Sequence, residues 1–230
     1  MKSLWDGIKD GALRLVDPVA GALARMGVSP NTLTTIGVLF TVVAAVAFGT
    51  GKIMLGGWVL SITGFFDVLD GGVARRADRA TVFGAFYDST LDRVGDGALM
   101  AGLTVFYATS TRFASVPLMI VCLVGMVGTF VISYTRARAE ALGLDAKVGF
   151  LQRPERFVLL AAPQALFGLA LEGRVLAGIV VLLAVTGWIS AIQRILFVRR
   201  LTTTEAIPRI RVVGDASAPV GQQASRRAHS

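Results

Sequence analysis

The stretch FFDVLDGGVARRADRATVFGAFYDSTLDR, residues 65–93, places four aspartates between segments that are otherwise apolar. These are Asp67, Asp70, Asp88 and Asp92. At about 100° per residue, the two members of each pair lie on one face of a helix. The polar residues between the pairs indicate a short turn, GGVARRADRATVFG, so that an antiparallel hairpin brings the pairs together. The stretch predicts a carboxylate cluster at one end of a helical bundle.

The rest of the chain indicates a membrane protein. Of its 230 residues, 54% are hydrophobic and 17% are charged. Long apolar runs with few charges predict membrane helices. Six candidate spans are residues 36–50, 53–66, 94–108, 114–132, 157–171 and 175–192. Some are shorter than the roughly 20 residues that cross a bilayer, and these lengthen if flanking polar residues join the helix. We expect an all-α integral membrane protein with six transmembrane helices.

Basic residues predict the orientation of these spans. The loops joining spans one to two, three to four and five to six hold only Lys52, Arg112 and Arg174. Apart from Arg93, nearly all other basic residues fall on the opposite side. By the positive-inside rule, that side and both termini are cytoplasmic, at the plasma membrane of a prokaryote. The net charge of +8 then lies mainly on one side and suits anionic lipids or anionic substrates. We do not expect a nucleic acid partner.

Three regions are expected along the chain. Residues 1–28 fit an amphipathic helix on the cytoplasmic leaflet, or a cap that packs on the bundle. Residues 29–201 form the transmembrane domain, and the polar residues 202–230 form a cytoplasmic tail that we expect to be disordered. The chain has one cysteine, Cys122, which excludes a disulfide framework and a cysteine metal site.

The carboxylate cluster favours divalent cations. Four carboxylates packed together repel one another unless they are protonated or neutralised, and Mg²⁺ or Mn²⁺ prefers oxygen ligands. The absence of histidine and cysteine from this cluster argues against zinc. The alternative is structural pairing with nearby arginines, which we expect for Asp96 with Arg93. Ionisable groups within membranes are costly and point first to function. Gly71, Gly72 and Gly84 allow a bulky ligand to approach.

The spacing also resembles a known signature. Asp67-x-x-Asp70-Gly71-x-x-Ala74-Arg75, then eight residues, then Gly84-x-x-x-Asp88-x-x-x-Asp92, resembles that of the CDP-alcohol phosphatidyltransferases. The signature spans 67–92, and every fixed position matches.

The resemblance implies a specific site. Two metal ions, Mg²⁺ or Mn²⁺, would be held by Asp67, Asp70, Asp88 and Asp92. CDP-diacylglycerol would bind through its diphosphate, an alcohol would attack the β-phosphate with release of CMP, and Asp92 would be the general base. The stretch before the first span resembles the part of the family that contacts cytidine. The implied CDP-lipid residues are Ser29, Pro30, Asn31, Thr32, Thr34, Gly71, Ala74, Arg75, Thr81 and Gly84.

A second group of residues bears on the acceptor alcohol. The stretch SYTRARAEALGLDAKVGFLQRPER, residues 133–156, is rich in arginine and lies on the side of the acidic cluster. It is either an ordinary positive-inside loop or an anion pocket, and planar arginines are well suited to phosphate. The candidate acceptor-phosphate residues are Arg136, Arg138, Arg153, Arg156 and Arg194, the last within an apolar span, where a lone charge needs a partner.

The same segments resemble phosphatidylinositol-phosphate synthases and their archaeal archaetidylinositol relatives. There the matching positions hold the phosphate of inositol 1-phosphate, and this is the acceptor we expect. Glycerol 3-phosphate is the alternative, as in phosphatidylglycerophosphate synthase. Two other classes stay open from the residues alone: a cation channel or transporter, and a lipid-binding scaffold with a structural metal site. A homodimer is also left open.

Overall fold

The structure is a computed structural model that describes residues 18–23, 25–76, 81–146, 148–149 and 153–204. It gives no account of the side chains at 68, 70–72, 74–76 and 204. The described part is helical, with a 3₁₀ turn, η1 (Leu171–Gly173), before the last helix. Its long elements are α2 (Pro30–Gly49), α3 (Ile53–Arg76), α4 (Val82–Thr109), α5 (Val116–Ala141), α6 (Arg153–Phe167) and α7 (Arg174–Thr204). Each predicted apolar span falls on one of these helices, which confirms the all-α prediction for this part of the chain.

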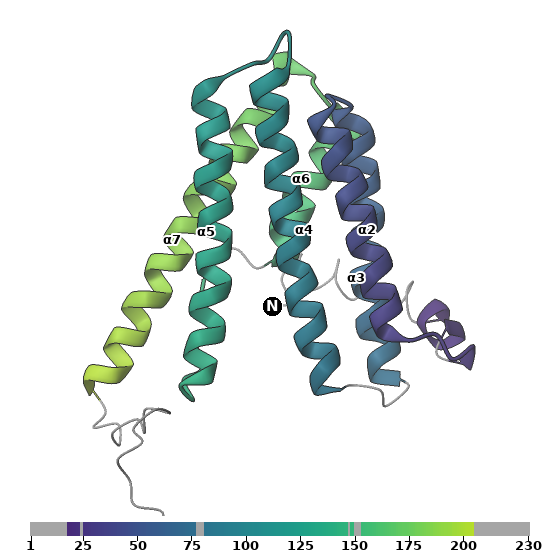
Figure 1. The fold of residues 1–230 in the computed structure, drawn as a ribbon, viewed down its shortest axis with the longest axis vertical. Coiled ribbons are helices and arrows are strands. Elements are labelled where there is room, and N and C mark those ends of the chain that lie inside the picture. Colours follow the sequence, from purple (N-terminus) through teal and green to yellow (C-terminus); the bar gives the residue numbers. More distant parts are fainter. Residues whose placement is uncertain (1–17, 24, 77–80, 147, 150–152, 205–230) are drawn as a thin grey trace, which may run out of the picture.

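The six helices alternate in direction and form a bundle (Figure 1). The connections α2–α3, α4–α5 and α6–α7 lie together at the top of the view, as the alternation of basic and non-basic loops predicts. Toward the lower end, α5 and α7 diverge from α2, α3 and α4. With 15 residues, α6 is much shorter than its neighbours and begins well short of the lower end. Its first residue, Arg153, therefore enters the middle of the bundle.

Neighbouring helices of the bundle approach one another closely at glycines. Helix α2 packs against α3 and α4, α3 against α6, and α5 against α4 and α7. A Cβ on Gly102 of α4 would lie 2.2 Å from the carbonyl oxygen of Ala45 in α2. A Cβ on Gly57 of α3 would lie 2.3 Å from the backbone nitrogen of Ala165 in α6. Only glycine permits these two approaches.

The predicted turn between the carboxylate pairs is shorter in the structure. Helix α3 continues through Gly71 and Gly72 to Arg76, and α4 begins at Val82. Thr81 caps α4, because its side chain accepts a hydrogen bond from the Gly84 backbone nitrogen at 2.9 Å. The prediction of a turn from residue 71 was wrong because helical glycines are tolerated where tertiary packing compensates for their low propensity.

Apolar side chains cover the outside of the bundle as well as its core. Leu39, Trp58, Val127 and Leu182 are all exposed large hydrophobic residues. Such a surface is unfavourable in water and suits a lipid environment. Within the described part of the chain, three helices are long and apolar enough to cross a membrane, namely Pro30–Gly49, Val116–Ala141 and Leu171–Thr203. Ile53–Asp67 is a shorter apolar segment.

Two regional predictions lie largely outside the described residues. Most of the predicted N-terminal amphipathic helix falls within residues 1–17, and the described residues 18–23 are helical. The predicted tail falls mostly within residues 205–230, while α7 extends to Thr204. Both regions stay predictions.

Candidate active site

The carboxylates of α3 and α4 converge on one guanidinium. Arg153 places Nη1 3.0 Å from Oδ2 of Asp67 and Nη2 2.8 Å from Oδ1 of Asp92. Its Nε lies 3.7 Å from Oδ1 of Asp96, one helical turn beyond Asp92. Three helices, α3, α4 and α6, thus meet at a single positive charge.

A second arginine and an aromatic ring complete this cluster. Arg93 lies 3.5 Å from Asp92 through Nη2 and 3.8 Å from Asp96 through Nε. The pairing of Asp96 with Arg93 was expected, and Arg153 adds to it. The guanidinium carbon of Arg153 lies over the ring of Phe157, 4.7 Å from its centroid, an arrangement that favours a cation. Partly buried charges are tolerated only when they are paired in this way.

Two further predicted metal ligands lie on the same helices. Asp88 is exposed, and its charge is within electrostatic range of both Asp67 and Asp92. Asp70 lies on α3, three residues beyond Asp67, and its side chain is outside the described residues. Among the described side chains, no three histidine, cysteine or acidic residues are grouped closely enough to hold a metal.

The donor chemistry nonetheless fits a cation at this position. Oxygens from two different helices already lie within 3.0 Å of one positively charged group, so the guanidinium of Arg153 occupies the place of a cation between them. Carboxylate oxygens are the ligands preferred by Mg²⁺ and Mn²⁺. Asp67 and Asp92 can therefore contribute to a divalent cation site.

The predicted CDP-lipid residues at the start of α2 lie beside the cap of α4. A Cβ on Gly84 would be 3.0 Å from Oγ1 of Thr81 and 3.3 Å from Oδ1 of Asn31. The sequence segments around residues 31 and 81–84 therefore meet, as the resemblance implies. Pro30 is in the first turn of α2, and Thr34 is buried with its hydroxyl directed at the Pro30 carbonyl, 3.2 Å away.

The remaining residues of this group are less informative. Ser29 and Thr32 are exposed at the helix start. Gly71, Ala74 and Arg75 lie on α3, and their side chains are outside the described residues.

Sequence reasoning missed one residue in this region, Tyr87. Its hydroxyl is 2.9 Å from that of Thr35, and the Thr35 hydroxyl also donates to the Asn31 carbonyl at 2.8 Å. The ring of Tyr87 stacks on Phe83 at 5.7 Å between centroids. Tyr87 thereby links α4 to the start of α2. Its position directly before Asp88 in the sequence could have marked Tyr87 as a residue close to the site.

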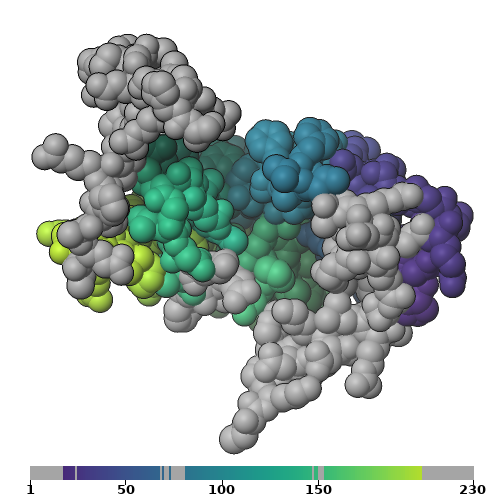
Figure 2. Space-filling model, turned by 90° about the horizontal axis from the view of Figure 1, so that it is seen from below, coloured from purple at the N-terminus to yellow at the C-terminus, as the bar shows by residue number. Residues whose placement is uncertain are grey.

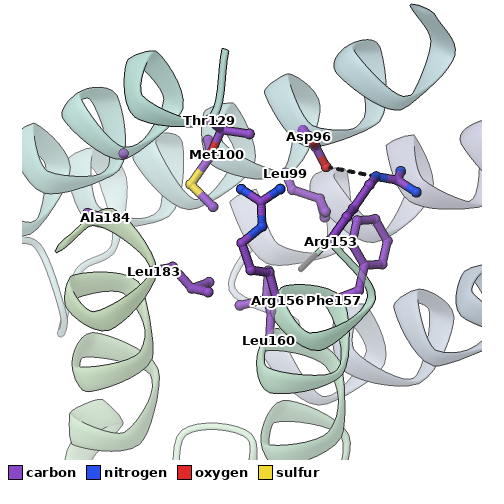
Figure 3. A pocket seen from close by; sticks show the side chains of 11 residues that line it. Asp96, Leu99, Met100, Thr129, Arg153, Arg156, Phe157, Leu160, Leu183 and Ala184 are labelled. Atoms are coloured by element: carbon purple, nitrogen blue, oxygen red, sulfur yellow. Dashed lines mark ion pairs between the residues drawn. The ribbon is translucent and has the colours of Figure 1, made fainter. Parts of the chain in front are cut away.

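The predicted acceptor arginines separate into distinct environments. Arg156 projects into a pocket between α4, α5, α6 and α7 (Figure 3). The pocket is lined by Asp96, Met100, Thr129, Arg156 and Leu183, among others. The buried Nε of Arg156 has no hydrogen-bond partner among the described residues. The buried Nε atoms of Arg153 and Arg194 also lack a hydrogen-bond partner, but other nitrogens of these two side chains donate hydrogen bonds.

Arg194 lies near this pocket but is partly satisfied by the backbone. It is 7% exposed and donates to the carbonyls of Ile132, in α5, and of Val148, the latter at 2.7 Å. The charges of Arg136 and Arg156 are within electrostatic range of Arg194. Two predicted arginines, one from α5 and one from α6, thus influence the charge of Arg194 in α7.

The other two predicted arginines behave differently. Arg138 is exposed near the end of α5. Arg153 also lines the pocket (Figure 3), but its Nη nitrogens are paired with the carboxylates of Asp67 and Asp92. Arg136 is itself paired with Glu140, with Nε 2.9 Å from Oε1. Glu140 was not singled out in the sequence, although an i, i+4 spacing signals such a pair.

Seen from below, the site lies between two groups of helix ends. The ends of α5 and α7 are on one side, and α2 and the start of α4 are on the other (Figure 2). The start of α6 lies between them. The helix that carries Arg153 and Arg156 therefore begins between these two groups of helix ends.

Comparison with known proteins gives consistent matches. The model of the CDP-alcohol phosphatidyltransferase family matches residues 27–203. A phosphatidylinositol phosphate synthase of Mycobacteroides abscessus is 43% identical over 150 residues, which are 65% of this chain and 67% of the relative. An archaetidylinositol phosphate synthase of Methanothermobacter thermautotrophicus is 35% identical over 185 residues, covering 80% of this chain and 89% of the relative.

Solved structures agree with the sequence matches. The crystal structure of Mycobacterium tuberculosis phosphatidylinositol phosphate synthase with CDP-DAG bound superposes with a TM-score of 0.72 and 36% identity. The match covers 80% of this chain and 92% of that one. The same enzyme was solved in complex with manganese and citrate, and this match also has a TM-score of 0.72.

Proposed function

Because the chain belongs to the CDP-alcohol phosphatidyltransferase family, we propose that it transfers the phosphatidyl group of CDP-diacylglycerol to inositol 1-phosphate. The products are phosphatidylinositol phosphate and CMP. The observation that carries this proposal is the convergence of Asp67 and Asp92 on one cationic position, beside a pocket that contains the unpartnered Nε of Arg156. One subsite suits a diphosphate held through cations, and the other suits a phosphorylated alcohol.

The donor binds at the junction of α2, α3 and α4, where Asn31, Thr81 and Gly84 lie together. The CDP-DAG bound to the Mycobacterium tuberculosis relative supports CDP-diacylglycerol as the donor. The absence of a side chain at Gly84 leaves room for the nucleotide next to Asn31 and Thr81. The full donor set also includes Ser29, Pro30, Thr32, Thr34, Gly71, Ala74 and Arg75.

Two divalent cations, Mg²⁺ or Mn²⁺, would be held by Asp67, Asp70, Asp88 and Asp92. When bound, they would neutralise the diphosphate and polarise its phosphorus centre. The relative solved with manganese supports a metal of this class. Through these cations, the four carboxylates would hold the diphosphate of the donor at this end of α3 and α4.

Asp92 acts as the general base of the transfer. Its carboxylate takes the proton of the acceptor hydroxyl as that oxygen forms a bond to the β-phosphorus. The bond between the β-phosphorus and the oxygen that bridges it to the α-phosphate breaks at the same centre, and CMP leaves with that oxygen. Ion pairs with Arg93 and Arg153 hold the carboxylate of Asp92 in position. The buried Asp96 pairs with the same two arginines.

The acceptor phosphate binds at the arginine pocket. Arg156 supplies the central contact, while Arg136 and Arg194 add positive charge from α5 and α7. Arginine favours phosphate because its planar fork donates several hydrogen bonds. A non-phosphorylated alcohol gains nothing from these three charges, so the pocket discriminates against free inositol.

The reaction takes place at a membrane surface. We propose that all six helices span the bilayer, with the acidic end and both termini on the cytoplasmic side of a plasma membrane. The three long apolar helices and the apolar outer surface support a membrane location, and the loop charges support the orientation. The lipid donor and the water-soluble acceptor then meet at the lower end of the bundle.

A direct assay separates the acceptors. Purified protein is incubated with CDP-diacylglycerol, Mg²⁺ or Mn²⁺, and radiolabelled inositol 1-phosphate, glycerol 3-phosphate or free inositol, and CMP release is measured. We expect release with inositol 1-phosphate and loss of release after chelation. Preference for glycerol 3-phosphate would overturn the acceptor, and no release with any acceptor would overturn the enzymatic proposal.

A further inference from the structure

Arg153 was expected to bind an acceptor phosphate, yet its guanidinium is paired with the carboxylates of Asp67, Asp92 and Asp96. Its two Nη nitrogens are 3.0 and 2.8 Å from the carboxylates of Asp67 and Asp92, two of the proposed metal ligands. A guanidinium that covers both carboxylates prevents their mutual repulsion in a site of limited exposure. Arg153 thus performs the neutralisation that a divalent cation would otherwise supply.

We infer that Arg153 is an internal counter-cation that exchanges with divalent cations on Asp67 and Asp92. A cation bound between these carboxylates would lie close to the Nη nitrogens, and like charges at such a separation are strongly disfavoured. Binding of the cation therefore requires that Nη1 and Nη2 leave the two carboxylates. The inference rests on the metal site of the proposed function.

The structure gives Arg153 a second set of contacts that survive this release. Its Nε faces Asp96 at 3.7 Å, and its guanidinium lies over Phe157. Asp96 is 8% exposed and is one turn deeper than Asp92, so it is not among the proposed metal ligands. Figure 3 shows Arg153 held between Asp96 and the ring of Phe157. The side chain can withdraw its Nη nitrogens from Asp67 and Asp92 while its Nε stays close to Asp96.

This exchange has a measurable consequence for metal affinity. A cation that must displace Arg153 binds more weakly than one that meets free carboxylates. In full-length protein in detergent without substrates, Mn²⁺ binding is followed by loss of the free Mn²⁺ signal in electron paramagnetic resonance. For Arg153→Gln we expect the Kd for Mn²⁺ to fall roughly 5- to 100-fold relative to the unmodified chain, a range typical of coupled sites.

Arg93→Gln is the matched control, because it removes the same unit charge beside Asp92 and Asp96. Among the described ion pairs, Arg93 has none with Asp67, so its loss changes the local potential without freeing the second carboxylate. We expect Arg153→Gln to tighten Mn²⁺ binding at least about threefold more than Arg93→Gln, as expected when direct displacement adds to charge. Equal effects of the two variants, or weaker Mn²⁺ binding by Arg153→Gln, would overturn the inference.

Thermal unfolding provides a second readout. When Mn²⁺ is removed by EDTA, Arg153 takes over its carboxylates in the unmodified chain, whereas Arg153→Gln leaves them to repel. The fall in Tm on chelation is therefore expected to be larger for Arg153→Gln than for the unmodified chain or Arg93→Gln. Arg153→Lys keeps the charge but has a single ammonium, so its Mn²⁺ affinity is expected to be intermediate. A fall in Tm on chelation no larger in Arg153→Gln than in the unmodified chain also contradicts the exchange.

These measurements are independent of turnover. Failure of the transfer assay together with tighter Mn²⁺ binding by Arg153→Gln would reject the proposed reaction and retain the exchange. Active transfer together with equal Mn²⁺ affinities in the Arg153 and Arg93 variants would retain the proposed reaction and reject the exchange.

Discussion

The hydroxyl of Tyr87 in α4 lies 2.9 Å from the hydroxyl of Thr35 in α2. Thr35 in turn donates to the carbonyl of Asn31, one turn earlier in its helix. This chain of contacts fixes the start of α2 against the helix that carries Asp88 and Asp92. Because Asn31 and Gly84 lie close together at the same junction, we expect Tyr87 to act as a positioning residue for the proposed nucleotide site.

Replacing Tyr87 is expected to weaken donor binding. Tyr87→Phe keeps the ring that stacks on Phe83 and removes one hydrogen bond, worth about 0.5–1.5 kcal/mol. We expect the KM for CDP-diacylglycerol to rise roughly twofold to tenfold, with little change in the KM for the acceptor. Tyr134→Phe is the control, because Tyr134 is 70% exposed on α5. An unchanged donor KM in Tyr87→Phe would show that the hydroxyl contact does not position the site.

The helices and the acidic hairpin could be predicted because their signals are local. Apolar runs gave six segments that are all helical, and spacings of three and four residues placed Asp67 and Asp92 on faces that meet. Polar residues and paired glycines at 71–72 suggested an early turn, but α3 continues to Arg76. Local propensity was outweighed there by the packing of the helix.

The partners of the arginines could not be predicted because they depend on where α6 begins. Arg153 and Asp67 are 86 residues apart in the chain, and their contact requires a short α6 that starts inside the bundle. The composition of residues 133–156 indicated an anion pocket but gave no means of separating Arg153, which faces carboxylates, from Arg156, which faces the pocket. Similarly, the hydropathy of the last span could not show that Arg194 donates to backbone carbonyls.

The close approach of α3 and α6 gives a prediction on stability. A Cβ on Gly57 would meet the Ala165 backbone at 2.3 Å, whereas a Cβ on Gly64 in the same helix would have no atom of a described neighbour within 4 Å. Gly57→Ala must therefore push α6 away, at a cost of about 1–3 kcal/mol or more, and Gly64→Ala is expected to change stability by less than about 0.5 kcal/mol.

Thermal unfolding in detergent measures both variants. Because α6 carries Arg153 and Arg156, Gly57→Ala should also lower turnover in the fraction that stays folded. Equal melting temperatures for the two variants would be incompatible with a backbone contact at Gly57.

The arginine pocket predicts a selective effect on the acceptor. Arg156→Gln removes a charged donor whose Nε has no partner among the described residues. Loss of a hydrogen bond between charged groups costs about 1.5–3 kcal/mol, so the KM for the phosphorylated acceptor should rise roughly 10- to 100-fold. The KM for CDP-diacylglycerol should stay within a factor of about two.

Arg174→Gln is a suitable control for this measurement. Arg174 is 81% exposed, pairs with Glu172, and lies at the opposite end of the bundle, so neither KM should change. If Arg156→Gln raised the KM values of donor and acceptor equally, the pocket would not be a separate acceptor site.

Asp92 gives the most direct prediction on the chemical step. Asp92→Asn keeps the size of the side chain and its place between Arg93 and Arg153, but an amide cannot accept the proton of the attacking hydroxyl. Removal of a general base lowers kcat by a factor on the order of 10² to 10⁴, and the same substitution weakens one proposed metal ligand. Binding of CDP-diacylglycerol, measured separately by calorimetry at saturating Mn²⁺, should fall far less than kcat, because Asp67, Asp70 and Asp88 remain to hold the cations. Glu172→Gln, at the far end of the bundle, should leave kcat unchanged. Turnover by Asp92→Asn within a factor of about ten of the unmodified enzyme, below the range expected for loss of a general base, would assign the proton transfer to another group.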